Sequence, residues 1–163
     1  MSKNPCHYLL LVILSYLVVP VSFGAITVDG LLNEPEWADA RVYSDFVTVE
    51  PLTSEPAKYV TEVRLITNEE GIFVGFTNYQ PASVKRINRR FARDADITAD
   101  RVTAGIDFDG TAESAYDFTV GSANSRKDGV MGGGTHSTDW DGTWYSQTSS
   151  DKDYWYSEIH IPW

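Results

Sequence analysis

The sequence predicts an all-β protein, an antiparallel β-sandwich of the jelly-roll or immunoglobulin-like kind with one short N-terminal helical turn. Three observations support this fold class. Short segments alternate apolar and polar residues, turn-forming residues separate them about every ten positions, and no long stretch has helical periodicity.

The expected strands follow from alternation within each segment. In chain order they are 42–50 (VYSDFVTVE), 60–67 (VTEVRLIT), 72–79 (IFVGFTNY), 101–108 (RVTAGIDF), 115–121 (AYDFTVG), 143–149 and 154–161 (YWYSEIHI). Asn-Glu-Glu-Gly at 68–71 predicts a tight hairpin between the second and third strands. Three glycines at 132–134 predict a flexible loop or a tight bend.

The helical turn is expected just after an Asp-Gly turn at 29–30, which ends a short strand. Asn33 is a suitable N-cap, and Glu36 stands three residues later, as in a capping box. Leu32 and Trp37 then occupy the positions of a hydrophobic staple. We therefore expect Trp37 to close a core, with a sugar-stacking platform as the alternative.

The first 24 residues are expected to be a signal peptide. Lys3 precedes an apolar run over 8–21, and small residues at 22–24 predict cleavage before Ala25, with a retained anchor as the alternative. The one cysteine, Cys6, lies in this leader, so residues 25–163 contain no disulfide and no thiolate site. They suffice for one domain. The apolar end at Trp163 predicts either a fragment of a longer chain, which we favour, or a last strand that closes the domain.

The chain is acidic, with a formal net charge of −10. This charge argues against nucleic-acid binding, which needs clustered Lys and Arg. The one basic run, 85–93 (KRINRRFAR), is followed at once by acidic 94–100 (DADITAD), so we expect local ion pairs there.

Four motifs in order resemble a known family. They are 26–37 (ITVDGLLNEPEW), 61–81 (TEVRLITNEEGIFVGFTNYQP), 93–129 and 140–163. The chain resembles the family 9 carbohydrate-binding modules and, more closely, the N-terminal domain of a group of exported bacterial proteins of unknown function. The resemblance implies an exported antiparallel β-sandwich that binds sugar at one site, with calcium bound in some members.

The resemblance also implies neighbouring domains and a particular sugar clamp. Members often precede a glycosidase, and the closer group usually continues into a region resembling an outer-membrane barrel. Sugar-binding members hold the sugar between two tryptophans, one of them just before the strand that corresponds to 101–107. This sequence has no aromatic there (ADITAD, 95–100), and Thr103 or Ala104 replaces an acidic residue typical of that strand.

Residues from the last predicted hairpin are the sugar-binding candidates. Sugar binding needs flat aromatic faces flanked by polar side chains. The candidates are Trp140, Asp141, Trp144, Tyr145 and Trp155. Because side chains alternate along a strand, part of this set must face the core. The alternative is that these aromatics serve only core packing or contact with a barrel.

Calcium is the candidate cofactor, at the turn around Gly110. Asp107, Asp109, Thr111 and Glu113 offer oxygen ligands at alternate positions, and the alternative is a solvent-exposed acidic turn. Catalysis has little support, because no serine lies in a nucleophile elbow and no spacing singles out two carboxylates.

We therefore expect a non-catalytic carbohydrate-binding module of an exported bacterial envelope protein associated with carbohydrate catabolism. Its partners would be a carbohydrate and a C-terminal membrane barrel of the same protein, and its location periplasmic, outer-membrane associated or secreted. The alternatives are a structural or interaction module preceding an outer-membrane region, or a module attached to a glycosidase. A structural module predicts that Trp140, Trp144 and Trp155 are all packed.

Overall fold

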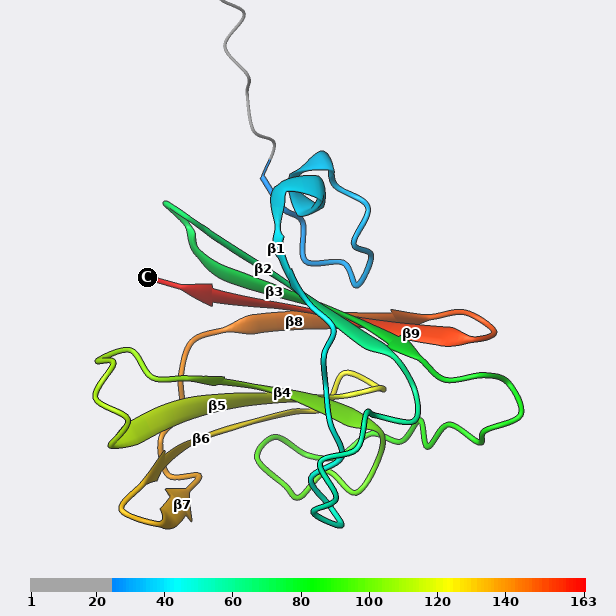
Figure 1. Ribbon diagram of the computed structural model, residues 1–163. Coiled ribbons are helices and arrows are strands. Elements are labelled where there is room, and N and C mark those ends of the chain that lie inside the picture. The colour runs from blue at the N-terminus through cyan, green and yellow to red at the C-terminus, as the bar shows by residue number, and fades with distance from the viewer. Residues whose placement is uncertain (1–24) are drawn as a thin grey trace, which may run out of the picture.

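Two antiparallel β-sheets lie one above the other and enclose the main core (Figure 1). This computed structural model describes residues 25–163, so the predicted signal peptide, 1–24, lies outside the described residues. The first sheet has the order β1-β2-β3-β9-β8, with bounds Arg41–Tyr43, Thr61–Asn68, Gly71–Tyr79, Tyr154–Pro162 and Tyr145–Ser150. The second has the order β4-β5-β6-β7, with bounds Arg101–Ile106, Ser114–Gly121, Arg126–Gly132 and Thr135–Ser137. The predicted all-β sandwich is confirmed.

Alternation along the central strands builds the core between the sheets. Inward-facing apolar residues come from both sheets, and they are Ile72, Val74 and Phe76 of β3, Val102 of β4, Phe118 and Val120 of β5, and Trp155, Ile159 and Ile161 of β9. The residues between them point to the two outer faces, because successive side chains of a strand alternate. The hairpin predicted at 68–71 is present, with Asn68 opposite Gly71.

Trp37 closes a second, smaller core on the outer face of the five-stranded sheet, as predicted. It lies on the 3-10 helix η1 (Pro35–Asp39), is fully buried, and packs with Ile26 and Phe73. Both Trp37 and Leu32 lie directly over Gly75 of β3, where a Cβ would meet their side chains. The N-terminal segment therefore covers this face of the sheet, as the blue segment in Figure 1 shows.

The predicted capping of this helix is wrong in detail. The N-cap is Glu34 rather than Asn33, and the Glu34 side chain makes no capping hydrogen bond to the helix. Glu34 Oε1 instead accepts a hydrogen bond from the backbone N–H of Thr27 (3.2 Å). The short strand expected before 29–30 is also not assigned. This segment is fixed by packing and long-range hydrogen bonds rather than by local capping.

The prediction of a long strand over 42–50 is also wrong. Only β1 forms there, and further on a single bridge joins Val47 to Pro56. Prolines at 51 and 56 lack the N–H that a strand partner needs, and the apolar side chains of Val47 and Val49 are exposed.

Two strands, β6 and β7, were not expected. Their residues, RKDGVMG and THS, are polar and rich in glycine, so they have little apolar alternation. They form because β5 offers its free edge, with Phe118 opposite Asp128 and Thr119 opposite Lys127. The glycines at 132–134 then form the bend between β6 and β7. Among residues 25–163, no helix is long and apolar enough to cross a membrane.

Candidate functional site

The aromatic candidates of the last hairpin do not form one exposed platform. Trp144 and Trp155 are only 2% and 4% exposed, and both belong to the main core. Tyr145 is 53% exposed on the outer face, where its ring stacks on His160 at 5.9 Å between centroids. Trp144 and Trp155 therefore offer no ring face to a ligand. The alternation was predicted correctly, but the tryptophans are on the side that is buried.

Trp140 is half-buried at the edge of the same core. Its ring packs edge-on against Tyr116 (4.7 Å between centroids) and Phe118 (5.9 Å), and it folds over Gly142, where a Cβ would collide with it. Trp140 thus serves packing, as the structural alternative predicts for all three tryptophans.

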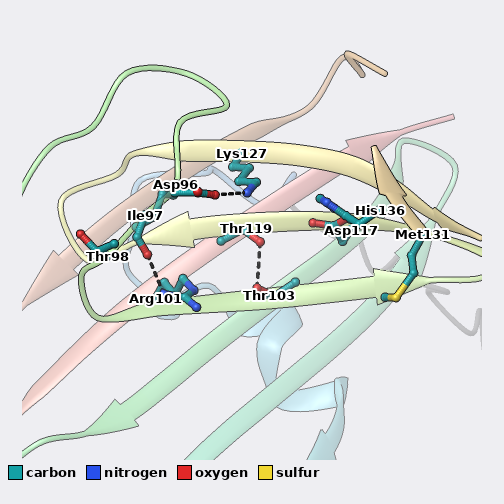
Figure 2. Close-up of a pocket in the computed structure, with 10 residues that line it drawn as sticks. All are labelled: Asp96, Ile97, Thr98, Arg101, Thr103, Asp117, Thr119, Lys127, Met131 and His136. Carbon is teal, nitrogen blue, oxygen red and sulfur yellow. Dashed lines mark hydrogen bonds and ion pairs between the residues drawn. The ribbon is translucent and has the colours of Figure 1, made fainter. Parts of the chain in front are cut away.

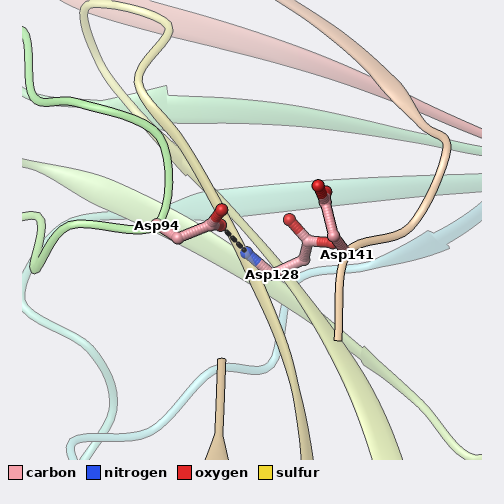
Figure 3. A group of neighbouring side chains, drawn as sticks. All are labelled: Asp94, Asp128 and Asp141. Carbon is pink, nitrogen blue, oxygen red and sulfur yellow. Dashed lines mark hydrogen bonds between the residues drawn. The ribbon is translucent and has the colours of Figure 1, made fainter. Parts of the chain in front are cut away.

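The neighbouring candidate, Asp141, belongs to a trio of carboxylates with Asp94 and Asp128 (Figure 3). Asp94, Asp128 and Asp141 are the one group within residues 25–163 in which three candidate metal ligands approach within 4.8 Å of one another. Arg93 pairs with all three, through Nε to Asp94 (3.1 Å) and through Nη2 to Asp128 and to Asp141 (2.7 Å).

The trio joins two loops to β6 through Arg93. Asp128 is fully buried, and its second oxygen accepts from the backbone N–H of Gly142 (2.7 Å). Burial raises the pKa of Asp128, while the Gly142 hydrogen bond and the charge of Arg93 lower it. The guanidinium therefore supplies the positive charge that these acids require. The ion pair between Arg93 and Asp94 is also one of the local ion pairs predicted for the basic run at 85–93.

The predicted calcium turn is built around one carboxylate. Asp107 Oδ1 accepts from the N–H groups of Asp109 (3.1 Å) and Gly110 (2.8 Å), and its Oδ2 accepts from Ala112 (2.7 Å). These backbone hydrogen bonds lower the pKa of Asp107. Asp107, Asp109 and Glu113 are not brought together as a set of ligands, and the hydroxyl of Thr111 accepts weakly from the Glu113 N–H (3.4 Å). Calcium binding at this turn stays a prediction.

A polar depression of about 520 Å³ lies on the outer face of the four-stranded sheet (Figure 2). Its lining combines outward residues of β4, β5, β6 and β7 with the loop that precedes β4, namely Asp96, Ile97, Thr98, Arg101, Thr103, Asp117, Thr119, Lys127, Met131 and His136. Antiparallel pairing places Thr103, Thr119 and Lys127 in one row across three strands. Neighbouring strands are about 4.8 Å apart, so this row spans roughly 10 Å.

Hydrogen bonds within the lining hold its polar groups in place. The hydroxyls of Thr103 and Thr119 are bonded at 2.8 Å, and Asp117 Oδ1 lies 2.6 Å from His136 Nε2. Gly129 makes the second contact possible, because a Cβ there would come within 2.7 Å of His136 Nε2. The imidazole crosses over this glycine to reach Asp117, which lies opposite Gly129 in the sheet.

The loop carboxylate of Asp96 pairs with a cation of β6. Lys127 Nζ lies 2.7 Å from Asp96 Oδ1. This hydrogen bond and the charge of Lys127 lower the pKa of Asp96, and Arg101 and His136 add smaller effects in the same direction. Arg101 donates from Nη1 to the carbonyl of Ile97 (2.6 Å). The depression thus combines the exposed hydroxyl of Thr103 with a carboxylate, an imidazole and two cations, while Thr119 and Asp117 are buried. Such exposed polar groups recognise a polyhydroxylated or charged small molecule.

Comparisons with known proteins identify the fold. No family model matches the sequence, and no curated protein matches it. Two solved structures of a family 9 carbohydrate-binding module from Caldicellulosiruptor kristjanssonii are similar. The one in complex with cellotriose has a TM-score of 0.58 and 16% identity over 86% of this chain and 64% of that chain. The one with glucose has a TM-score of 0.59 and 17% identity over 88% and 67%.

The chain has the fold of a family 9 carbohydrate-binding module. The resemblance inferred from the four motifs is thereby confirmed at the level of fold. The chain spans about two thirds of the length of these two structures.

The depression was not found by reasoning from the sequence. Its residues come from four strands and one loop, and two of those strands, β6 and β7, were not predicted. One signal in the sequence pointed to this place, namely the departure from the family pattern at 95–100 and at Thr103. Ile97, Thr98 and Thr103 all line the depression. Asp117 and Thr119 also alternate with buried Phe118 and Val120.

Proposed function

We propose that this domain is a non-catalytic carbohydrate-binding module that binds sugar in the depression on the four-stranded sheet. The observation that carries the proposal is the convergence of hydroxyl, carboxylate, imidazole and cationic side chains on one open face of this fold. Such groups exchange hydrogen bonds with sugar hydroxyls. The two similar structures, of a family 9 module from Caldicellulosiruptor kristjanssonii, were solved in complex with cellotriose and with glucose.

The position of the depression also supports the proposal. The family resemblance implies a sugar-clamping tryptophan just before the strand that is β4 here. Ile97 and Thr98 occupy that stretch and line the depression. The site would therefore keep the family's position while replacing aromatic stacking with polar contacts. We further propose export, on the signal-peptide pattern of residues 1–24.

The test is isothermal titration calorimetry of the purified protein against a panel of neutral and acidic mono- and oligosaccharides. Thr103→Val removes one hydroxyl of the depression at nearly constant volume and should weaken binding about two- to tenfold, since a hydrogen bond contributes about 0.5–1.5 kcal/mol. Thr111→Val, in the exposed β4–β5 turn, is the matched control and should bind like the original protein.

Two results would reject this site. Binding that survives Thr103→Val and is lost in Tyr145→Ala would move the site to the outer face of the other sheet. A folded protein that binds no sugar in the panel would favour the structural or interaction module, which the packing of Trp140, Trp144 and Trp155 already fits.

A further inference from the structure

The lining of the depression is poor in flat apolar surface. It contains no Phe, Tyr or Trp, and its apolar side chains are those of Ile97 and Met131. Neutral sugars gain much of their affinity by laying C–H faces on aromatic rings. A ligand of this depression must therefore gain more of its affinity from polar contacts than a sugar stacked on an aromatic ring does. Hydrogen bonds to ionised groups are about twice as strong as those between neutral groups.

Both cations of the depression lie in the same lining as an exposed carboxylate, and one of them pairs with it. Lys127 Nζ lies 2.7 Å from Asp96 Oδ1, and Arg101 and His136 line the same depression. The Asp96 side chain is 88% exposed, so burial does not hold it there. An exposed carboxylate of a loop thus marks a position in the depression that suits an anion.

Arg101 has spare capacity for a second carboxylate. Within residues 25–163, the one hydrogen bond of the Arg101 side chain goes from Nη1 to the Ile97 carbonyl. No carboxylate of this part of the chain lies within salt-bridge distance of the guanidinium. A guanidinium presents a planar fork of donors that matches a carboxylate. By contrast, the acid deeper in the depression, Asp117, already has His136 as its partner.

We propose that the ligand of this depression is an acidic sugar, a uronate whose carboxylate is bound by Arg101 and Lys127 in competition with Asp96. The sugar ring then lies over β4 and β5, where the exposed hydroxyl of Thr103 exchanges hydrogen bonds with its ring hydroxyls. This inference rests on the proposed function and adds the chemical class of the sugar. Asp96 acts as an internal competitor that the ligand carboxylate displaces.

The experiment compares matched sugars that differ only at C6. Calorimetry at pH 7 measures the affinity for D-glucose and D-glucuronate, and for D-galactose and D-galacturonate. At least one uronate should bind about tenfold or more tightly than its neutral partner, and only uronate binding should weaken as NaCl is raised.

Three variants assign the preference to the named side chains. Arg101→Gln should reduce the ratio of uronate to neutral affinity severalfold, whereas Asp96→Asn should raise uronate affinity severalfold and leave neutral-sugar affinity within about twofold. Lys152→Gln, which removes a cation from the exposed β8–β9 turn, is the matched control and should change neither affinity. Circular dichroism melts verify that each variant is folded.

The outcomes separate this inference from the proposed function. If each uronate binds no better than its neutral partner while the neutral sugars bind, the acidic-sugar inference is wrong and the carbohydrate-binding proposal stands. A uronate preference that persists in Arg101→Gln would also overturn the assignment. If no sugar of either kind binds the folded protein, both proposals fail.

Discussion

Glu158 should make the stability of this domain depend on pH. It lies on β9 beneath the N-terminal turn and is only 1% exposed. Its Oε2 accepts hydrogen bonds from the N–H groups of Asp29 (2.9 Å) and Gly30 (2.6 Å), while its Oε1 has no partner among residues 25–163. Burial raises the pKa of Glu158 to about 7, the two backbone hydrogen bonds oppose this, and the nearby charges of Glu34 and Asp29 add to it.

The magnitude follows from the difference between the folded and unfolded pKa. One pH unit corresponds to about 1.4 kcal/mol, so a rise from 4.5 to about 7 corresponds to about 3 kcal/mol. Between these values the folded protein binds more protons than the unfolded chain, so its free energy of unfolding falls as pH rises. The loss begins near pH 4.5 and is complete somewhat above pH 7.

Urea denaturation of the protein and of Glu158→Gln, at intervals from pH 4.5 to pH 8.5, measures this effect. The amide mimics the protonated carboxyl, so the variant should gain stability relative to the original protein by about 3 kcal/mol across this range. Groups remote from Glu158 cancel in the comparison, so the difference reports Glu158 together with the acids beside it. Glu69→Gln, on the exposed β2–β3 turn, is the control and should give a flat difference. A flat difference for Glu158→Gln as well would refute the reasoning.

Two further predictions concern packing and charge. Trp37→Ala should lower the free energy of unfolding by about 3–5 kcal/mol, because it empties the core under the N-terminal segment; a loss below about 1 kcal/mol in chemical denaturation would contradict its role as a plug. Arg93→Met should lower the free energy of unfolding by about 3–5 kcal/mol at pH 7, because it leaves the buried Asp128 charge unpaired. Chemical denaturation at pH 4 should show a smaller loss of stability than at pH 7, because Asp128 becomes protonated and no longer needs a partner charge. An equal loss at both pH values would show that charge is not the cause.

The fold could be predicted because its central elements obey simple periodicity. The hairpin of β2 and β3 alternates along its length and turns at 68–71, and β9 alternates with Trp155 inward. Trp37 could be predicted because its neighbours in sequence indicate a helical turn with a hydrophobic staple. The capping detail failed because Glu34 bonds to Thr27, a contact decided by tertiary structure.

The candidate site could not be predicted because its residues meet only through strand pairing. His136 reaches Asp117 across Gly129, and all three lie on different strands, one of which has no apolar alternation. The prediction of an exposed aromatic platform on the last hairpin failed for a related reason. Alternation shows which residues share a face, but not which face is covered, and the second sheet covers the one that carries Trp155.

The central claim is that sugar binds on the outer face of the four-stranded sheet. The most direct measurement is a titration of the ¹⁵N-labelled protein with the tightest-binding sugar, followed by amide chemical-shift perturbation. The account predicts shifts concentrated at 96–103, 117–119 and 127–136, with little change along Tyr145–Ser150. Shifts concentrated around Tyr145 and His160, or no shifts with any sugar, would contradict it.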